Sequence, residues 1–158
     1  MAIAVGDDIR ARATASRFAT ETAPNLRAMA KLIDAESLRH SGKTAQAIVE
    51  FGEARKLADL AIGHVLLAKA LLDAKRYAEA YGELQTCLQR RGEIAIDPYD
   101  APGYHRLPEI TFELARAQEG LGNPAAAASY NAFLAALHEP DTDFVLARTA
   151  RARLAAMK

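Results

Sequence analysis

Residues 64–88, HVLLAKALLDAKRYAEAYGELQTCL, contain two helix-forming runs on either side of a short break at residues 74–76. A small residue, Ala68, lies in the first run, and another, Ala80, lies in the second. Two helices approach closely only where small side chains face each other, because bulky ones hold the axes apart. The stretch therefore predicts an antiparallel helical hairpin that is packed through Ala68 and Ala80.

The same pattern recurs along the chain at a fixed step. Residues of the first and second copies are matched at a distance of 33 positions: Ala35 and Ala68, Leu38 and Leu71, Ala47 and Ala80, Phe51 and Leu84, Ala54 and Cys87. A third copy contains Leu114, Ala115, Gly122, Ala127, Tyr130 and Leu134, and its Ala127 lies 47 positions after Ala80. One repeat plus an insertion of about 13 residues explains that longer step.

Composition excludes several classes of protein. The chain has 158 residues, and 36 Ala against 4 Val and 8 Ile favour helices over sheets in one domain, 1–158. The 20 basic residues balance the 20 acidic ones, so we expect no binding to nucleic acid. The single Cys87 excludes an internal disulfide. Neither a membrane-spanning run nor a signal-peptide pattern is present, so we expect a cytoplasmic protein without membrane insertion.

Turn and capping residues divide the sequence into helices. Pro24 suits a first helical turn, Gly42 suits a helix end, and Asp59 suits an N-cap. The expected elements are an N-terminal helix over 7–20, repeat 1 over 24–58, repeat 2 over 59–91, an insertion loop over 92–107, repeat 3 over 108–138 and a C-terminal capping helix over 141–157.

These copies resemble the tetratricopeptide repeat family, whose units are helix-turn-helix pairs of about 34 residues. The second copy carries the resemblance through Leu67, Ala68, Leu71, Tyr77, Ala80, Leu84 and Cys87, although His64 replaces the family's leading Trp. The first copy departs further, with Lys31 and Asp34 where apolar residues are usual. The resemblance implies an all-α, right-handed superhelix of three hairpins with flanking N- and C-terminal helices.

A closer resemblance covers residues 89–122, QRRGEIAIDPYDAPGYHRLPEITFELARAQEGLG. This stretch is similar to the tetratricopeptide segment found C-terminally in some bacterial multidomain signalling proteins, including serine/threonine kinases and winged-helix regulators. The chain contains no kinase signature. The resemblance therefore implies an accessory module, alone or as part of a longer chain.

The residue types that usually perform catalysis do not form a recognisable site. No two of the four histidines have the i, i+4 spacing of a helical metal site, and Cys87 occupies a position where the repeat places a small core residue. Residues 41–44, SGKT, lack the earlier glycine and the preceding strand of a phosphate-binding loop. We therefore expect a protein that is not an enzyme and that uses no metal or cofactor.

In the tetratricopeptide fold, the first helices of the hairpins line a concave face. The repeat registers place the following residues there as candidates for partner binding: Glu36, Arg39, Lys69, Asp73, Phe112, Glu113 and Arg116. Ordinary solvated helix charges are the competing interpretation. In the insertion loop, Asp97, Tyr99, Asp100 and Tyr104 suggest a partner-binding lip or an oxygen-ligand cation site. Alternatively, its apolar and aromatic residues fill the gap between hairpins.

The leading functional hypothesis is a non-catalytic interaction module that binds a peptide or a partner domain on the concave face. The alternative is an intramolecular regulatory or dimerisation segment of a larger bacterial signalling protein, which includes a homodimer. A small helical enzyme ranks third, because no acid–base pair or cofactor motif is present.

The hairpin packing can be tested by overpacking. Ala68→Leu or Ala80→Leu should separate the paired helices and lower the free energy of unfolding by about 1–3 kcal/mol. Thermal denaturation followed by circular dichroism measures this loss. An unchanged melting temperature for both variants would show that the register is wrong.

Overall fold

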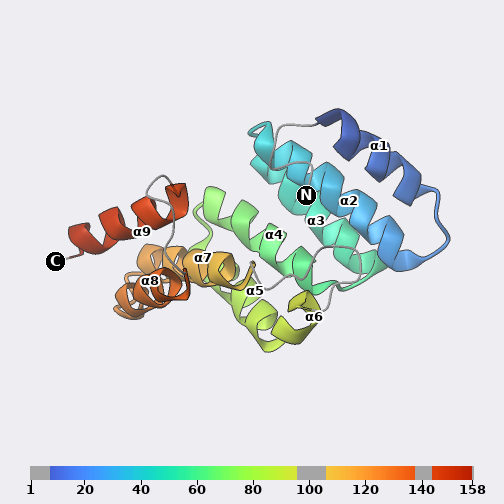
Figure 1. The fold of residues 1–158 in the computed structure, drawn as a ribbon. Coiled ribbons are helices and arrows are strands. Elements are labelled where there is room, and N and C mark those ends of the chain that lie inside the picture. Colours follow the sequence, from blue (N-terminus) through green and yellow to red (C-terminus); the bar gives the residue numbers. More distant parts are fainter. Residues whose placement is uncertain (1–7, 96–105, 138–143, 158) are drawn as a thin grey trace. The chain divides into compact units, whose positions relative to one another are not determined.

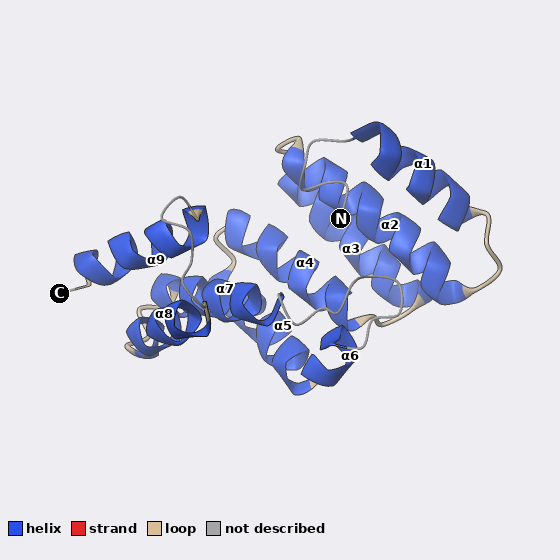
Figure 2. Ribbon diagram, viewed as in Figure 1, coloured by secondary structure: helices blue, strands red, loops and turns tan. Residues whose placement is uncertain are grey.

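A computed structural model describes residues 8–95, 106–137 and 144–157, and within them all regular secondary structure is helical (Figures 1 and 2). The helices are α1 (Asp8–Ala19), α2 (Pro24–His40), α3 (Thr44–Leu57), α4 (Ala61–Asp73), α5 (Tyr77–Gln89), α6 (Arg91–Ala95), α7 (Arg106–Gly120), α8 (Ala125–Ala136) and α9 (Val145–Ala156). The predicted all-α class is confirmed. The chain forms two compact units, residues 1–76 and 77–158, and the division falls inside the predicted repeat 2.

The predicted insertion loop over 92–107 is wrong at both ends. Residues 91–95 form α6, because the Arg90 guanidinium binds the Glu93 carboxylate through two hydrogen bonds of 2.8 and 2.7 Å at the i, i+3 spacing that favours a helix. At the other end, α7 begins at Arg106, two residues before Pro108. Proline is tolerated there, because the amide hydrogens of a first helical turn have no partner within the helix.

Unit 1 (residues 1–76) is built around α2, which packs against α1, α3 and α4. Alanines permit this close packing, since Ala28, Ala35 and Ala47 have no exposed surface. Between α1 and α2, Ala15 packs in a small cluster with Ile33. The small-residue pattern found in the sequence therefore lies in the core of this unit.

Helices α2, α4 and α7 all end in the same turn. Gly42, Lys75 and Gly122 have positive φ angles of 77°, 58° and 65°. In each case the next N–H donates to the carbonyl oxygen five residues earlier: Lys43 to Leu38 at 2.9 Å, Arg76 to Leu71 at 2.8 Å and Asn123 to Gln118 at 2.8 Å. This Schellman arrangement satisfies carbonyls at the helix end and redirects the chain. The turns are 33 and 47 residues apart, which are the two steps predicted from the side-chain pattern.

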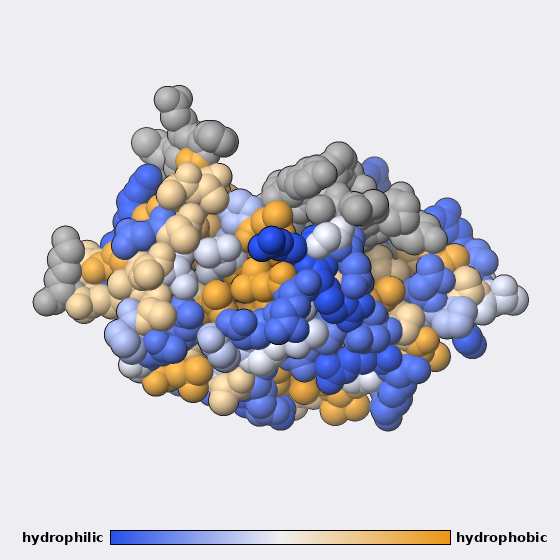
Figure 3. All heavy atoms as spheres, turned by 90° about the horizontal axis from the view of Figure 1, so that it is seen from below, coloured by the Kyte–Doolittle hydropathy of each residue, from blue (hydrophilic) through white to orange (hydrophobic). Residues whose placement is uncertain are grey.

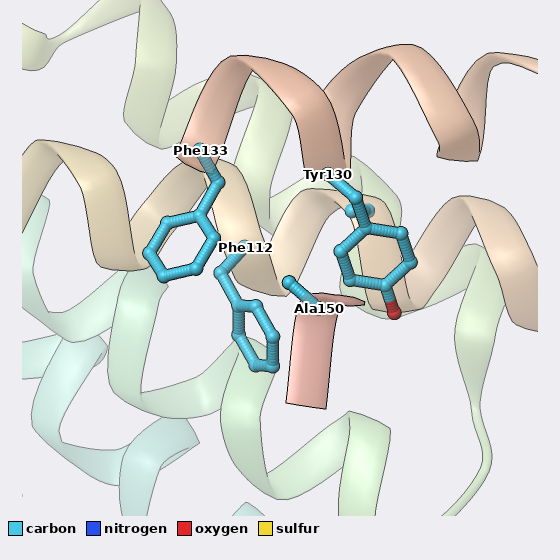
Figure 4. Packing of buried hydrophobic residues seen from close by; sticks show 5 residues of the cluster. Phe112, Tyr130, Phe133 and Ala150 are labelled. Atoms are coloured by element: carbon cyan, nitrogen blue, oxygen red, sulfur yellow. The ribbon is translucent and has the colours of Figure 1, made fainter. Parts of the chain in front are cut away.

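Unit 2 (residues 77–158) has an aromatic core between α7, α8 and α9. Phe112 lies between Phe133 and Tyr130, with ring centroids 5.2 and 5.8 Å apart, and Ala150 of α9 packs against this cluster (Figure 4). Tilted and edge-on ring pairs of this kind stabilise a core beyond the area that they bury.

The register predicted for the third repeat differs from the observed one in α8. Ala126 and Phe133 are buried, whereas the predicted core residues Ala127 and Leu134 stay partly exposed. The buried Ala126 lies four residues after the left-handed Gly122, whereas Ala47 and Ala80 lie five residues after Gly42 and Lys75. The turn before α8 also differs: the Asn123 side chain accepts a hydrogen bond from the Ala125 N–H at 2.9 Å, and the helix starts three residues after Gly122, and not two as in α3 and α5.

None of the helices in the described ranges has both the length and the apolar character needed to cross a bilayer. Figure 3 shows hydrophilic and apolar side chains interspersed over one face of the molecule.

The three turns generate a prediction about backbone conformation. Lys75→Gly should raise the free energy of unfolding by about 0.5–1 kcal/mol, because a residue with a Cβ is disfavoured at positive φ. Gly42→Ala and Gly122→Ala should each lower it by about 1 kcal/mol for the same reason, since an added Cβ meets no atom within 4 Å at either position.

Chemical denaturation measures these changes. Ala74→Gly is the matched control, because Ala74 has an ordinary φ of −82° and should lose stability on the same substitution. A destabilised Lys75→Gly variant would contradict the observed turn.

Candidate functional site

Three of the predicted groove residues form an ion cluster on α2 and α4. Glu36 and Arg39 are one helical turn apart on α2, and Asp73 is the last residue of α4. Arg39 Nε and Nη2 donate to the two Glu36 carboxylate oxygens at 2.9 and 2.7 Å, and Nη1 donates to Asp73 Oδ2 at 2.8 Å. All three guanidinium nitrogens are thus engaged, and Arg39 connects two helices of unit 1.

Burial and charge have opposite effects on Glu36. Its side chain is only 5% exposed, and burial by itself raises the pKa of a carboxyl group. The hydrogen bonds and charge of Arg39, together with the charges of Lys69 and His40, outweigh burial and lower the pKa of Glu36. The hydrogen bond to Glu36 is the main reason that the pKa of Arg39 is raised. Glu36 and Arg39 are therefore both ionised at neutral pH, and Lys69 belongs to their electrostatic surroundings.

The hydrogen bonds of the cluster hold its charged side chains in place. Its two carboxylates are opposed by Arg39 and by the nearby Lys69, so the charges nearly balance. His40 Nε2 lies 3.3 Å from Glu36 Oε1. An arrangement of this kind presents fixed charges to a neighbouring molecule, because its side chains have little conformational freedom left to lose on binding.

The candidates in unit 2 are less accessible than the sequence predicted. Phe112 was expected on the groove surface, but it is 3% exposed and belongs to the aromatic core. Glu113 is equally buried, and its carboxylate accepts a hydrogen bond from Arg116 at 2.7 Å. Both are buried because α7 packs against two helices, α5 and α8. More than one face of α7 is therefore covered, whereas an amphipathic pattern predicts a single buried face. Arg116 is the only one of the three that keeps substantial exposure.

The loop candidates Asp97, Tyr99, Asp100 and Tyr104 lie outside the described residues.

Sequence reasoning missed a second polar cluster, which joins the last three helices of unit 2. The Glu119 carboxylate on α7 accepts hydrogen bonds from the Tyr130 hydroxyl at 2.7 Å and from Arg153 at 3.0 Å. Burial, followed by the bond to Glu119, raises the pKa of Tyr130. No short sequence motif predicts this contact, because Arg153 lies 34 residues after Glu119. Its fixed geometry ties α8 and α9 to α7.

His64 and Cys87 belong to residue types that often act in catalysis, and both are buried in the fold. His64 is buried, and its Nε2 lies 3.0 Å from Asp59 Oδ1. Asp59 was expected to cap α4, but the N-cap is Leu60, so the carboxylate is left to pair with His64. Burial raises the pKa of the Cys87 thiol to about 11, which makes it a poor nucleophile.

A metal site is not apparent in the part of the chain that the structure describes, since no group of three or more His, Cys, Asp or Glu side chains could hold an ion. Comparisons of the chain with models of protein families, with curated proteins and with solved structures give no match. The function must therefore be argued from the residues described above.

The ion cluster predicts an acid-sensitive unit 1. Because the pKa of Glu36 is lower in the folded chain than its ordinary 4.5, its contribution is complete above pH 4.5 and is lost as pH falls through the folded value. Glu36→Gln should lower the free energy of unfolding at pH 7 by about 1.5–3 kcal/mol and reduce its loss in acid. Urea titrations at several pH values measure both effects.

Asp34 provides a control of opposite sign. Burial, and then the charge of Glu50, raise the pKa of Asp34, so its charged form costs stability at neutral pH. Asp34→Asn should therefore stabilise the chain at pH 7. The same response of Asp34→Asn and Glu36→Gln at pH 7 would contradict these assignments.

Proposed function

We propose that the chain is a non-catalytic protein–protein interaction module of the tetratricopeptide type, with three hairpins in a right-handed superhelix. It binds a peptide or a partner domain on the concave face made by the first helices of its hairpins. The repeated turns at Gly42, Lys75 and Gly122 support the repeat, because they give α2, α4 and α7 the same ending at the steps of 33 and 47 residues that the sequence pattern shows.

The main support for this binding face is the hydrogen bond that Arg39 on α2 donates to Asp73 on α4. These helices are the first members of repeats 1 and 2, two of the three repeats in which groove residues were predicted, and the bridge connects candidate residues of both. Asp73 and Lys69 retain partial exposure beside the bridge. The charged side chains of this surface are already ordered before a partner binds. They therefore lose little conformational entropy on binding.

The preferred ligand is a peptide that carries both acidic and basic side chains. Lys69 offers a positive charge to an acidic group, and Asp73 offers a negative charge to a basic one. The two residues are four positions apart on α4, so they lie on the same side of that helix. Nucleic acid is a poorer fit, because its uniform negative charge would meet the carboxylates of the cluster.

The proposed setting is the cytoplasm of a bacterium, as an accessory module of a signalling protein. The resemblance of residues 89–122 to such modules supports it. A regulatory or dimerisation segment is the second candidate, and an exposed hollow on unit 1, described below, favours it.

The test is a peptide-display selection against the wild-type chain, followed by affinity measurements on charge variants. For an enriched peptide, Lys69→Glu should weaken binding about tenfold, which corresponds to about 1.4 kcal/mol. The loss should shrink at high salt, because the contact is exposed and electrostatic. Lys43→Glu is the matched control, since Lys43 is an exposed lysine in the turn between α2 and α3 and should bind normally.

Two results would overturn the proposal. One is a selection that enriches no peptide although the chain is folded by circular dichroism. The other is an equal loss of affinity in Lys69→Glu and Lys43→Glu, which would place the peptide elsewhere.

A further inference from the structure

A hollow of about 480 Å³ lies on unit 1 between α2 and α3. It is lined by Leu38 from α2 and by Ala45, Gln46, Val49 and Glu50 from α3. Val49 is 63% exposed and adds apolar surface to the hollow. The lining therefore combines apolar side chains with the polar Gln46 and Glu50, as a binding surface does.

Carboxylates border this hollow. Glu50 forms part of its lining and pairs with Lys31 at 2.9 Å. Asp34 lies one helical turn before Leu38 on α2, and its charge interacts unfavourably with that of Glu50. With two carboxylates and one ammonium, the border is acidic and favours an apolar partner that carries positive charge.

The outer side of α9 is apolar and basic, which complements the apolar and acidic hollow. Val145 is 60% exposed, and Arg148 lies one turn later on the same side of the helix, with Arg151 beside it. Residues 144–157 contain no acidic residue. Both arginines are exposed, and neither has an ion pair with a described residue. After Ile9, Val49 and Val145 are the most exposed large apolar side chains in the described part of the chain.

We infer that a second copy of this chain occupies the hollow, with its α9 placed between α2 and α3, Val145 against Val49, and Arg148 and Arg151 beside Asp34 and Glu50. Charge complementarity selects this occupant, because the acidic border and the basic helix are both exposed and both surround an apolar side chain. The contact is heterologous, so each copy keeps one hollow and one α9 available for a further copy.

In such an association, the arginines of a neighbouring copy would offset the cost of the charge on Asp34. The inference does not depend on the proposed peptide-binding face, since the two surfaces share no residue. Because each patch is small, the association is expected to be weak and to require high protein concentration.

The test is sedimentation of two charge-reversed variants, alone and mixed. One variant is Asp34→Arg, and the other is the double variant Arg148→Glu with Arg151→Glu. The wild-type chain should sediment faster as its concentration rises, and each variant alone should lose this dependence. An equimolar mixture should regain it, because each variant then meets the opposite charge. At about 1 M salt, where the screening length is about 3 Å, the recovery should disappear.

Cysteine cross-linking keeps the inference testable if a charge variant fails to fold. A mixture of Val49→Cys and Val145→Cys should give a disulfide-linked dimer under mild oxidation, whereas Val49→Cys with Leu121→Cys, another exposed position, should not. Cys87 does not interfere, because it is buried.

A wild-type chain that is monomeric at every concentration, with no cross-link, would overturn the inference. So would a mixture that associates no better than its components. A cross-link that forms equally with both partners would show random collision and would also contradict it.

Discussion

A left-handed residue at the end of a helix is the constraint on which the hairpins depend. At Gly42, Lys75 and Gly122 the chain leaves α2, α4 and α7 with positive φ, and the following N–H bonds to a carbonyl five residues earlier. The bond satisfies a carbonyl that the helix end would otherwise leave without a partner, and it sets the direction of the next helix. Glycine permits this conformation freely at two of the turns, and Lys75 adopts it at an energetic cost.

Polar contacts then fix the helices that these turns redirect. In unit 1, Arg39 is held by Glu36 on its own helix and joins α2 to α4 through Asp73. In unit 2, Glu119 joins α7 to α8 and α9 through Tyr130 and Arg153. Each cluster lies at the border of packed apolar or small residues, where hydrogen bonds to charged groups are stronger than in water. The same contacts leave partly exposed charges held in place, which is the property that the proposed binding face uses.

Local signals made the boundaries of α2 predictable from the sequence, whereas the burial of side chains on α7 was not. Pro24 and Gly42 act on the backbone next to them, so they indicate where α2 begins and ends without knowledge of the rest of the fold. Phe112 and Glu113 were misplaced on the surface, because their burial depends on which neighbouring helices cover α7. The bond between Glu119 and Arg153 could not be predicted for the same reason: it depends on how segments 34 residues apart pack.

Amide hydrogen exchange and φ angles measured by NMR test the central claim, which is that one turn is used three times. The N–H groups of Lys43, Arg76 and Asn123 should exchange slowly compared with exposed amides, since each donates to a carbonyl oxygen at 2.8–2.9 Å. Coupling constants should give Lys75 a positive φ near 58°. Rapid exchange at Arg76 together with a negative φ at Lys75 would contradict the account, because the second repeat would then lack the turn that defines the other two.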